Sequence, residues 1–156
     1  MQTNTDRLLL VEKVFILKAL SIFRDTPEHI LADLAPLMEE EEYDQNRLIF
    51  REGERGDCMY IIHQGEVRIH KGDTLLANLN EKEVFGELSL LDADVRSASA
   101  TTNSYCILFR INQEPFYELI EIRPEVARGF IKILCQRLRA QNEKSVQAGN
   151  KSGGGS

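Results

Sequence analysis

The first forty residues alternate between apolar and polar positions with the spacing of α-helices. From Leu8 to Leu20 the apolar residues at positions 8, 11, 15 and 19 share one face, because a helix repeats every 3.6 residues. A second helix is predicted to begin at Thr26-Pro27-Glu28, since threonine is a favourable N-cap and proline suits the first helical position. Its apolar side consists of Ile30, Leu31, Leu34 and Leu37.

The helical spacing of apolar residues ends near Glu42. From there to Ile111, short segments rich in isoleucine, valine, tyrosine and leucine alternate with turn residues. Many short strands separated by glycine turns are typical of an all-β sandwich or barrel, here of jelly-roll type. Four glycines fall at predicted turns that need a positive φ: Gly53, Gly56, Gly65 and Gly72. The glutamates Glu39–Glu42 end the helical region and are interpreted as a solvated entry to the first strand, without a site.

Helical spacing returns after the β region. One helix is predicted over Gln113–Ile122, and another begins at Pro124 and runs to about Ala140. The second carries an apolar stripe formed by Val126, Phe130, Ile133, Leu134 and Leu138. The predicted fold class is therefore α+β, mainly β: a jelly-roll β-roll flanked by N-terminal helices and two C-terminal helices.

Composition narrows the class of protein. Of the 156 residues, 42% are hydrophobic and 28% are charged, as in ordinary globular proteins, and no apolar run approaches the ~20 residues of a membrane span. The three scattered cysteines lack metal-ligand spacing, which favours a reducing, cytoplasmic compartment. A net charge of −6 argues against a general nucleic-acid binder, which is usually basic.

Gly86, Glu87 and Arg96 lie close together in the stretch FGELSLLDADVRSASA. A short helix starting at Glu87 would leave its first N–H groups unpaired, and Gly86 would let an anion approach them. The guanidinium of Arg96 matches phosphate oxygens, whereas the carboxylate of Glu87 repels an anion but accepts a hydrogen bond from a hydroxyl. A phosphate beside a ribose hydroxyl satisfies both residues. The alternative is an ion pair between Arg96 and Glu87 across a loop, which contributes little.

The stretch FGELSLLDADVRSASATT resembles the phosphate-binding cassette of the cyclic nucleotide-binding domain family, whose pattern is FGE, L/I/M, A-L, a variable run and R-x-A-S/T. Upstream, GERGDCMYIIHQGEV resembles the family's turn pattern G-x-x-x-D-x-x-Y-x-x-x-x-G. The likeness extends from about Phe23 to Leu138. It implies a regulatory domain similar to those of cyclic-nucleotide-dependent kinases, gated channels and the catabolite activator protein.

The resemblance also implies domain boundaries. The binding domain would occupy residues 26–140, with the β-roll at about 42–111 and the C-terminal helices at about 113–140. Residues 1–25 form an N-terminal helical segment in front of it. The polar segment 141–156 ends in KSGGGS and is interpreted as a flexible tail, either a linker or a cloning remnant.

The resemblance implies a role for each residue of the cassette. Glu87 would bind the ribose 2′-hydroxyl, and Arg96 would neutralise the cyclic phosphate. Contacts from the backbone or from small side chains are implied for Gly86, Leu88, Ser89, Ser97 and Ala98. The last helix would form a lid over the base, and Arg137 falls where channel members of the family carry a lid arginine.

Three departures from the family pattern bear on the ligand. Val95 replaces a proline, Ser89 replaces an alanine, and Ser97 replaces the alanine of cAMP-selective kinases. In cGMP-selective relatives this last position is often threonine, whose hydroxyl can reach the guanine amino group. The expected ligand is cAMP; the alternatives are cGMP, or a degenerate domain that serves protein contacts only.

Neither catalysis nor a cofactor or metal is expected. A metal enzyme on a similar roll needs clustered histidines, commonly an H-x-H pair with an acid, and His29, His63 and His70 do not provide it. No helix-turn-helix follows Arg139, so no nucleic-acid partner is expected. The expected partners are a cyclic nucleotide and an output domain in a longer parent protein.

Overall fold

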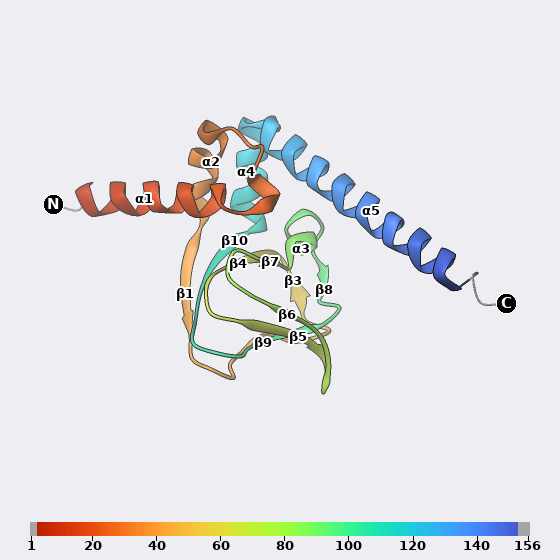
Figure 1. Ribbon diagram of the computed structural model, residues 1–156. Helices are drawn as coiled ribbons and strands as arrows, with labels where there is room; N and C mark the ends of the chain where they lie inside the picture. Colours follow the sequence, from red (N-terminus) through yellow and green to blue (C-terminus); the bar gives the residue numbers. More distant parts are fainter. Residues whose placement is uncertain (1–2, 153–156) are drawn as a thin grey trace.

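The structure is a computed structural model that describes the backbone of residues 3–152 and the side chains of residues 10–132, 134–136, 138–144 and 146. Helices precede and follow a block of strands along the chain, and in space they form a layer at one end of the β-roll (Figure 1). This arrangement confirms the predicted α+β fold class with a jelly-roll β-roll between helical segments.

The N-terminal helical part contains two α-helices and two short 3-10 turns. They are α1 (Thr3–Lys18), η1 (Ser21–Phe23), α2 (Glu28–Leu34) and η2 (Ala35–Leu37). The predicted start of the second helix is wrong by one residue, because Pro27 is the N-cap of α2 rather than its first helical residue. Pro27 has φ −59° and ψ 144°, an extended conformation that places its ring before the first turn.

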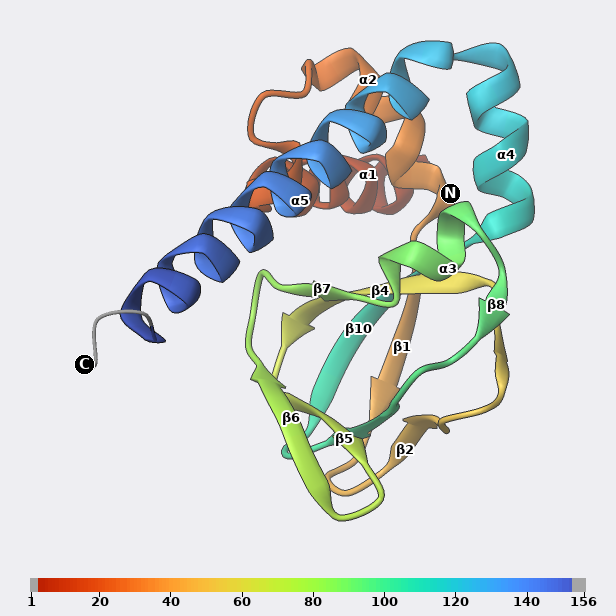
Figure 2. The same cartoon turned by 90° about the vertical axis from the view of Figure 1, so that its right-hand side faces the viewer.

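The β region forms two four-stranded antiparallel sheets and one two-stranded sheet (Figure 2). The first sheet has the order β1 (Glu39–Tyr43), β10 (Cys106–Asn112), β4 (Cys58–Gln64) and β7 (Val84–Phe85). The second has the order β2 (Leu48–Phe50), β9 (Ser99–Thr102), β5 (Val67–Lys71) and β6 (Thr74–Leu79). The third pairs β3 (Arg55–Gly56) with β8 (Asp94–Val95).

The strands begin earlier than the sequence predicts, because the glutamates Glu39–Glu42 belong to β1. This strand pairs with β10, where Arg110 lies opposite Glu39. Glu41 accepts a hydrogen bond of 2.5 Å from the Tyr43 hydroxyl, and its carboxylate lies 3.6 Å from Arg110 Nη1. Glu39, Glu40 and Glu42 are exposed, as predicted for a solvated segment, but the sequence alone does not show that the partner strand places an arginine beside Glu41.

Strand β4 divides two hydrophobic clusters, because successive side chains of a strand point to opposite faces. Tyr60 and Ile62 lie inside the β-roll with Val67, Phe85, Ala100 and Leu108. Met59 and Ile61 point out of the roll and pack in the cluster that contains Leu17, Leu31, Leu34, Phe116 and Phe130. The helical layer is therefore joined to the roll through one face of the first sheet.

Two helices follow the roll. Helix α4 spans Gln113–Ile122, as predicted, and α5 begins at Pro124 but continues past Ala140 to Ser152. The predicted end of this helix near Ala140 is therefore wrong. The interpretation of 141–156 as a flexible tail stays a prediction, and residues 153–156 lie outside the described part. The segment after Ala140 is polar but contains no proline, so nothing in it stops a helix as a proline would.

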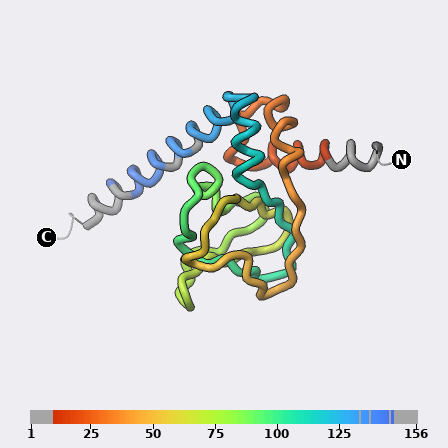
Figure 3. The backbone as a smooth tube through the Cα atoms, turned by 180° about the vertical axis from the view of Figure 1, so that it is seen from behind, coloured from red at the N-terminus to blue at the C-terminus, as the bar shows by residue number. Residues whose placement is uncertain are grey.

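Helix α5 is attached to the molecule near its N-terminal end. The ring of Phe130 makes edge contacts with Phe23, at 5.5 Å between centroids, and with Phe116, at 4.8 Å. Beyond this point α5 projects away from the helical layer, on the opposite side from α1 (Figure 3). None of the helices in the described part of the chain combines the length and the apolarity that a bilayer span requires.

Candidate ligand-binding site

A cleft of about 680 Å³ opens between helix α3 (Glu87–Leu91), the β-roll and α5. Its volume lies in the range of small-molecule sites in proteins. Apolar side chains from three parts of the fold line it: Phe50, Ile69, Val84, Phe85, Leu88, Leu91, Val95 and Leu134. The polar lining comes from α3 and from the segment that follows it: Glu87, Ser89, Asp92, Asp94, Arg96 and Ser97.

Helix α3 begins at Glu87, as predicted, and Gly86 is its N-cap. Gly86 has φ +74°, a left-handed conformation that favours glycine. A Cβ at this position would also lie 2.6 Å from Arg96 Nη1 and 3.2 Å from the Cys58 carbonyl oxygen. Both the backbone conformation and the available space therefore require glycine at position 86.

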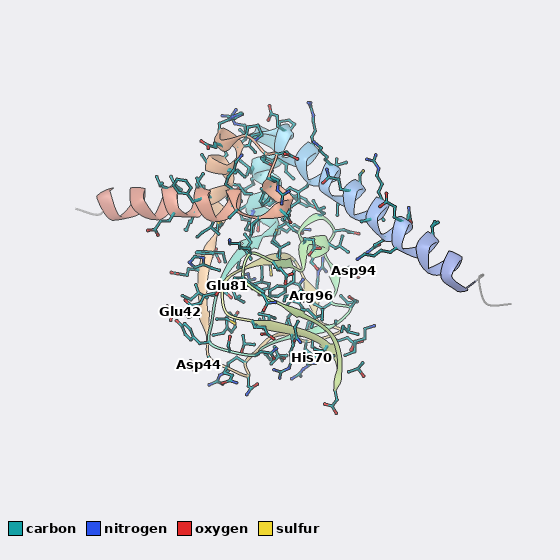
Figure 4. All side chains as sticks on the ribbon, viewed as in Figure 1. Glu42, Asp44, His70, Glu81, Asp94 and Arg96 are labelled. Atoms are coloured by element: carbon teal, nitrogen blue, oxygen red, sulfur yellow. The ribbon has the colours of Figure 1, made fainter. Side chains whose placement is uncertain are left out.

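Arg96 is the buried cation of the cleft, with an exposed fraction of 6%. It lies at the end of the β-roll that faces α3 (Figure 4). Its Nη1 atom donates to Ser89 Oγ at 3.0 Å, and Nη2 donates to the Cys58 carbonyl oxygen at 2.9 Å and to Cys58 Sγ at 3.3 Å. Its Cζ atom lies 4.1 Å from the centroid of the Phe50 ring, a cation–π contact.

The hydrogen-bond acceptors around the Arg96 guanidinium do not compensate its positive charge. A guanidinium has five N–H donors, and Arg96 makes three hydrogen bonds to described residues. The acceptors in these bonds are a hydroxyl, a carbonyl and a thiol, all neutral groups. Since burying a charge is costly unless an opposite charge compensates it, the cleft is suited to an anionic ligand beside Arg96.

The backbone of Arg96 is fixed by the loop that precedes β4. The amide of Arg96 donates to the Glu54 carbonyl at 2.7 Å, and the Gly53 amide donates to the Arg96 carbonyl at 2.8 Å. Next to these bonds, Gly56 pairs with Asp94. A Cβ on Gly56 would lie 2.5 Å from Arg96 Cζ, so the glycine provides room for the guanidinium.

This geometry corrects the prediction for Gly56. Among the described residues, the glycines with positive φ are Gly53, Gly65, Gly72 and Gly86, whereas Gly56 lies in β3 and is buried. Sequence reasoning also missed Cys58 and Phe50 as neighbours of Arg96. The turn pattern that contains Gly56 and Cys58 was the available signal, but it did not indicate which segment the turn contacts.

The structure brings together the predicted cassette residues: Gly86, Glu87, Leu88, Ser89, Arg96, Ser97 and Ala98 all line the cleft. Leu88 is 65% exposed at its edge, Glu87 is half-buried, and Ser97 is exposed. Their roles toward a ligand stay predictions. The side chain of Arg137 lies outside the described residues, although its backbone belongs to α5.

The predicted apolar stripe of α5 has three different environments. Val126 and Phe130 are buried in the helical core, Leu134 lines the cleft, and Leu138 is 59% exposed. The side chain of Ile133 lies outside the described part of the chain. The stripe therefore connects the helical core to the cleft within two turns of α5.

The sequence profile of the family described as "Cyclic nucleotide-binding domain" matches residues 40–123, more than half of the chain. The chain belongs to the cyclic nucleotide-binding domain family. The matched segment of this family domain contains all the described lining residues of the cleft except Leu134 of α5.

Individual relatives agree with the family. The chain is 30% identical over 132 residues to the CRP-like cAMP-activated global transcriptional regulator of Mycobacterium tuberculosis, covering 81% of this chain and 59% of the relative. It is 30% identical over 136 residues to human cGMP-dependent protein kinase 2, covering 82% of this chain and 18% of the kinase. The chain thus spans about three fifths of the first relative's length and less than a fifth of the second's.

A solved structure is similar over most of both chains. The N-terminal domain of a transcriptional regulator from Streptomyces coelicolor superposes with a TM-score of 0.74 at 28% identity, covering 83% of this chain and 93% of that one. The likeness therefore includes helices on both sides of the roll as well as the segment matched by the family profile.

Proposed function

We propose that this cyclic nucleotide-binding domain is a non-catalytic regulatory module that binds cAMP in the cleft and transmits occupancy through α5. The observation that carries the proposal is the buried guanidinium of Arg96, which faces the cleft and is bonded to neutral acceptors. A cyclic phosphate supplies one negative charge of the right size. No group on this chain is assigned a catalytic role.

The remaining parts of a cyclic nucleotide fit other residues of the lining. The carboxylate of Glu87 lies in the cleft wall and can accept a hydrogen bond from the ribose 2′-hydroxyl. The base, which has two apolar faces, is assigned to the space beside Leu88 and Leu134. This arrangement leaves Arg96 for the phosphate.

Transmission through α5 follows from the position of Leu134. Phe130 fixes α5 to the helical core, and Leu134, one turn later, lines the cleft. A ligand that contacts Leu134 favours one position of α5 over others, and it can shift that equilibrium only by the difference between its affinities for the two positions. An output domain in a longer protein is the proposed recipient of this movement.

One observation favours cGMP as a second candidate ligand. Ser97 is exposed and lines the cleft next to Arg96, so its hydroxyl is available to the amino group of a guanine. cAMP has no amino group in the corresponding position. Titration with both nucleotides therefore decides between cAMP and cGMP.

Titration calorimetry and thermal unfolding with cAMP, cGMP and 5′-AMP test the proposal. A ligand at 100 times its Kd stabilises the folded state by about 2.7 kcal/mol, which raises the melting temperature by about 5–10 °C for a domain of this size. We expect this shift with cAMP and not with 5′-AMP. The absence of a shift with either cyclic nucleotide at millimolar concentration would support the degenerate domain instead, and a preference for cGMP of tenfold or more would reverse the assignment of the ligand.

A further inference from the structure

We infer that Ser89 is a positioning residue that orients the guanidinium of Arg96 before the ligand arrives; this rests on the proposed function and extends it. Ser89 Oγ accepts a hydrogen bond of 3.0 Å from Arg96 Nη1. The family pattern quoted above has alanine at this position, whereas this chain has serine. The inference concerns the conformation of Arg96 in the unliganded protein as well as the affinity for a ligand.

Three contacts together determine the orientation of the guanidinium. The Phe50 ring, 4.1 Å from Cζ, covers one face of the guanidinium. The bond from Nη2 to the Cys58 carbonyl, at 2.9 Å, fixes one end. The bond from Nη1 to Ser89 fixes the other end. Without the hydroxyl, Nη2 is the only side of the guanidinium that a hydrogen bond to the described residues still holds, and the Phe50 ring still covers one face.

Ser89 is itself attached to a part of the fold outside the cleft. Its carbonyl accepts a hydrogen bond of 3.4 Å from Gln113 Nε2. The Tyr117 hydroxyl donates to the Leu91 carbonyl at the end of α3, and Leu90 is fully buried. Helix α4 therefore fixes the backbone of α3, so removing the hydroxyl of Ser89 leaves the helix in place.

A hydroxyl suits this role better than a carboxylate would. It is neutral, so it orients Arg96 without compensating the charge that attracts the ligand. Ser89 thus stabilises the guanidinium without competing with a phosphate for it.

The test compares Ser89→Ala with Ser89→Thr, which keeps the hydroxyl, and with Ser104→Ala, the same chemical change outside the cleft lining. We expect Ser89→Ala to weaken cAMP binding about three- to tenfold, the effect of one hydrogen bond, while Ser89→Thr restores most of the affinity. Alanine favours helices more than serine does, so unfolding of α3 would not explain a loss. Unchanged or tighter binding by Ser89→Ala would overturn the inference.

A second measurement needs no ligand. Nitrogen NMR of the Arg96 side chain reports rotation about Nε–Cζ, which we expect to be slow in the wild type and in Ser104→Ala and faster in Ser89→Ala. Equal rotation rates in all three proteins would overturn the positioning role. If the wild type binds neither cyclic nucleotide, the proposed function fails, whereas the NMR comparison still decides whether Ser89 positions Arg96.

A double substitution separates positioning from direct contact with the ligand. In an Arg96→Lys background, measured at high cAMP concentration, Ser89→Ala should reduce affinity less than twofold, because the planar group that Ser89 orients is gone. The same loss in both backgrounds would mean that Ser89 acts on the ligand directly, and the positioning role would be rejected.

Discussion

Gly56 and Arg96 lie so close together that a side chain does not fit between them: a Cβ on Gly56 would be 2.5 Å from Arg96 Cζ. The substitution Gly56→Ala should therefore displace the guanidinium and break its bonds to Ser89 and Cys58. We expect cAMP affinity to fall at least tenfold, and stability to fall by about 1–3 kcal/mol, as is typical of overpacking. Calorimetric titration and denaturant unfolding measure the two effects.

Gly72→Ala is the matched control for this prediction. Gly72 has φ +56° and open space around its Cβ position, so alanine there is strained but touches nothing. We expect a loss of stability of about 1 kcal/mol with no change in affinity. If Gly56→Ala bound cAMP as tightly as Gly72→Ala does, the close approach to Arg96 would be irrelevant to binding.

Ser97 is the residue of the cleft whose hydroxyl distinguishes a guanine from an adenine in the proposed function. Ser97→Ala should weaken cGMP binding by about 0.5–1.5 kcal/mol, the net contribution of one hydrogen bond, and should change cAMP binding less. Ser97→Thr keeps the hydroxyl and should keep the cGMP affinity. Competition titrations with both nucleotides provide the measurement, and equal losses for the two would exclude a role of Ser97 in base selection.

Regular features of the sequence were sufficient to predict much of this fold. The spacing of apolar residues gave α4 its observed bounds, Gln113–Ile122. The contiguous cassette also predicted that Gly86, Glu87 and Arg96 would meet, because a short helix and a short strand separate them by few residues. Features that depend on residues close together in the sequence could therefore be predicted.

Features that depend on contacts between distant segments could not be predicted from the sequence. The close approach of Gly56 to Arg96 joins residues forty positions apart, and local conformation does not reveal it because Gly56 lacks the positive φ that was expected. The pairing of Glu39–Glu42 with β10 was not predicted, because β10 lies far along the chain. In both cases a tertiary contact, rather than local preference, determined the role of the residue.

Tyr60 gives the fold a measurable sensitivity to alkaline pH. Burial raises the pKa of its phenol above the ordinary value of 10.0, and the neighbouring Cys58 adds to this effect. Because the folded state favours the protonated phenol, its contribution to stability is complete below pH 10 and is lost as the pH rises above that value. In Tyr60→Phe, the slope of unfolding free energy against pH should fall by up to about 1.4 kcal/mol per pH unit.

Denaturant unfolding between pH 8 and pH 11 measures this slope. The wild type, unfolded under the same conditions, provides the reference. A wild-type slope that Tyr60→Phe does not reduce would show that other groups cause the alkaline loss.

Leu134 and Leu138 test the proposal that α5 contacts the ligand. Leu134 lines the cleft one turn beyond the fixed Phe130, whereas Leu138 is 59% exposed and absent from the lining. If α5 closes over the base, Leu134→Ala removes apolar contact from the bound state, at a cost of about 1 kcal/mol, and speeds dissociation about fivefold. Association should change little if α5 closes only after the ligand enters, as the proposed function requires. Stopped-flow mixing with a fluorescent cyclic nucleotide measures both the association and the dissociation rate, with Leu138→Ala as the control.

Equal acceleration of dissociation by the two substitutions, or none from Leu134→Ala, would mean that α5 does not contact the bound ligand. In that case α5 cannot report occupancy of the cleft through Leu134.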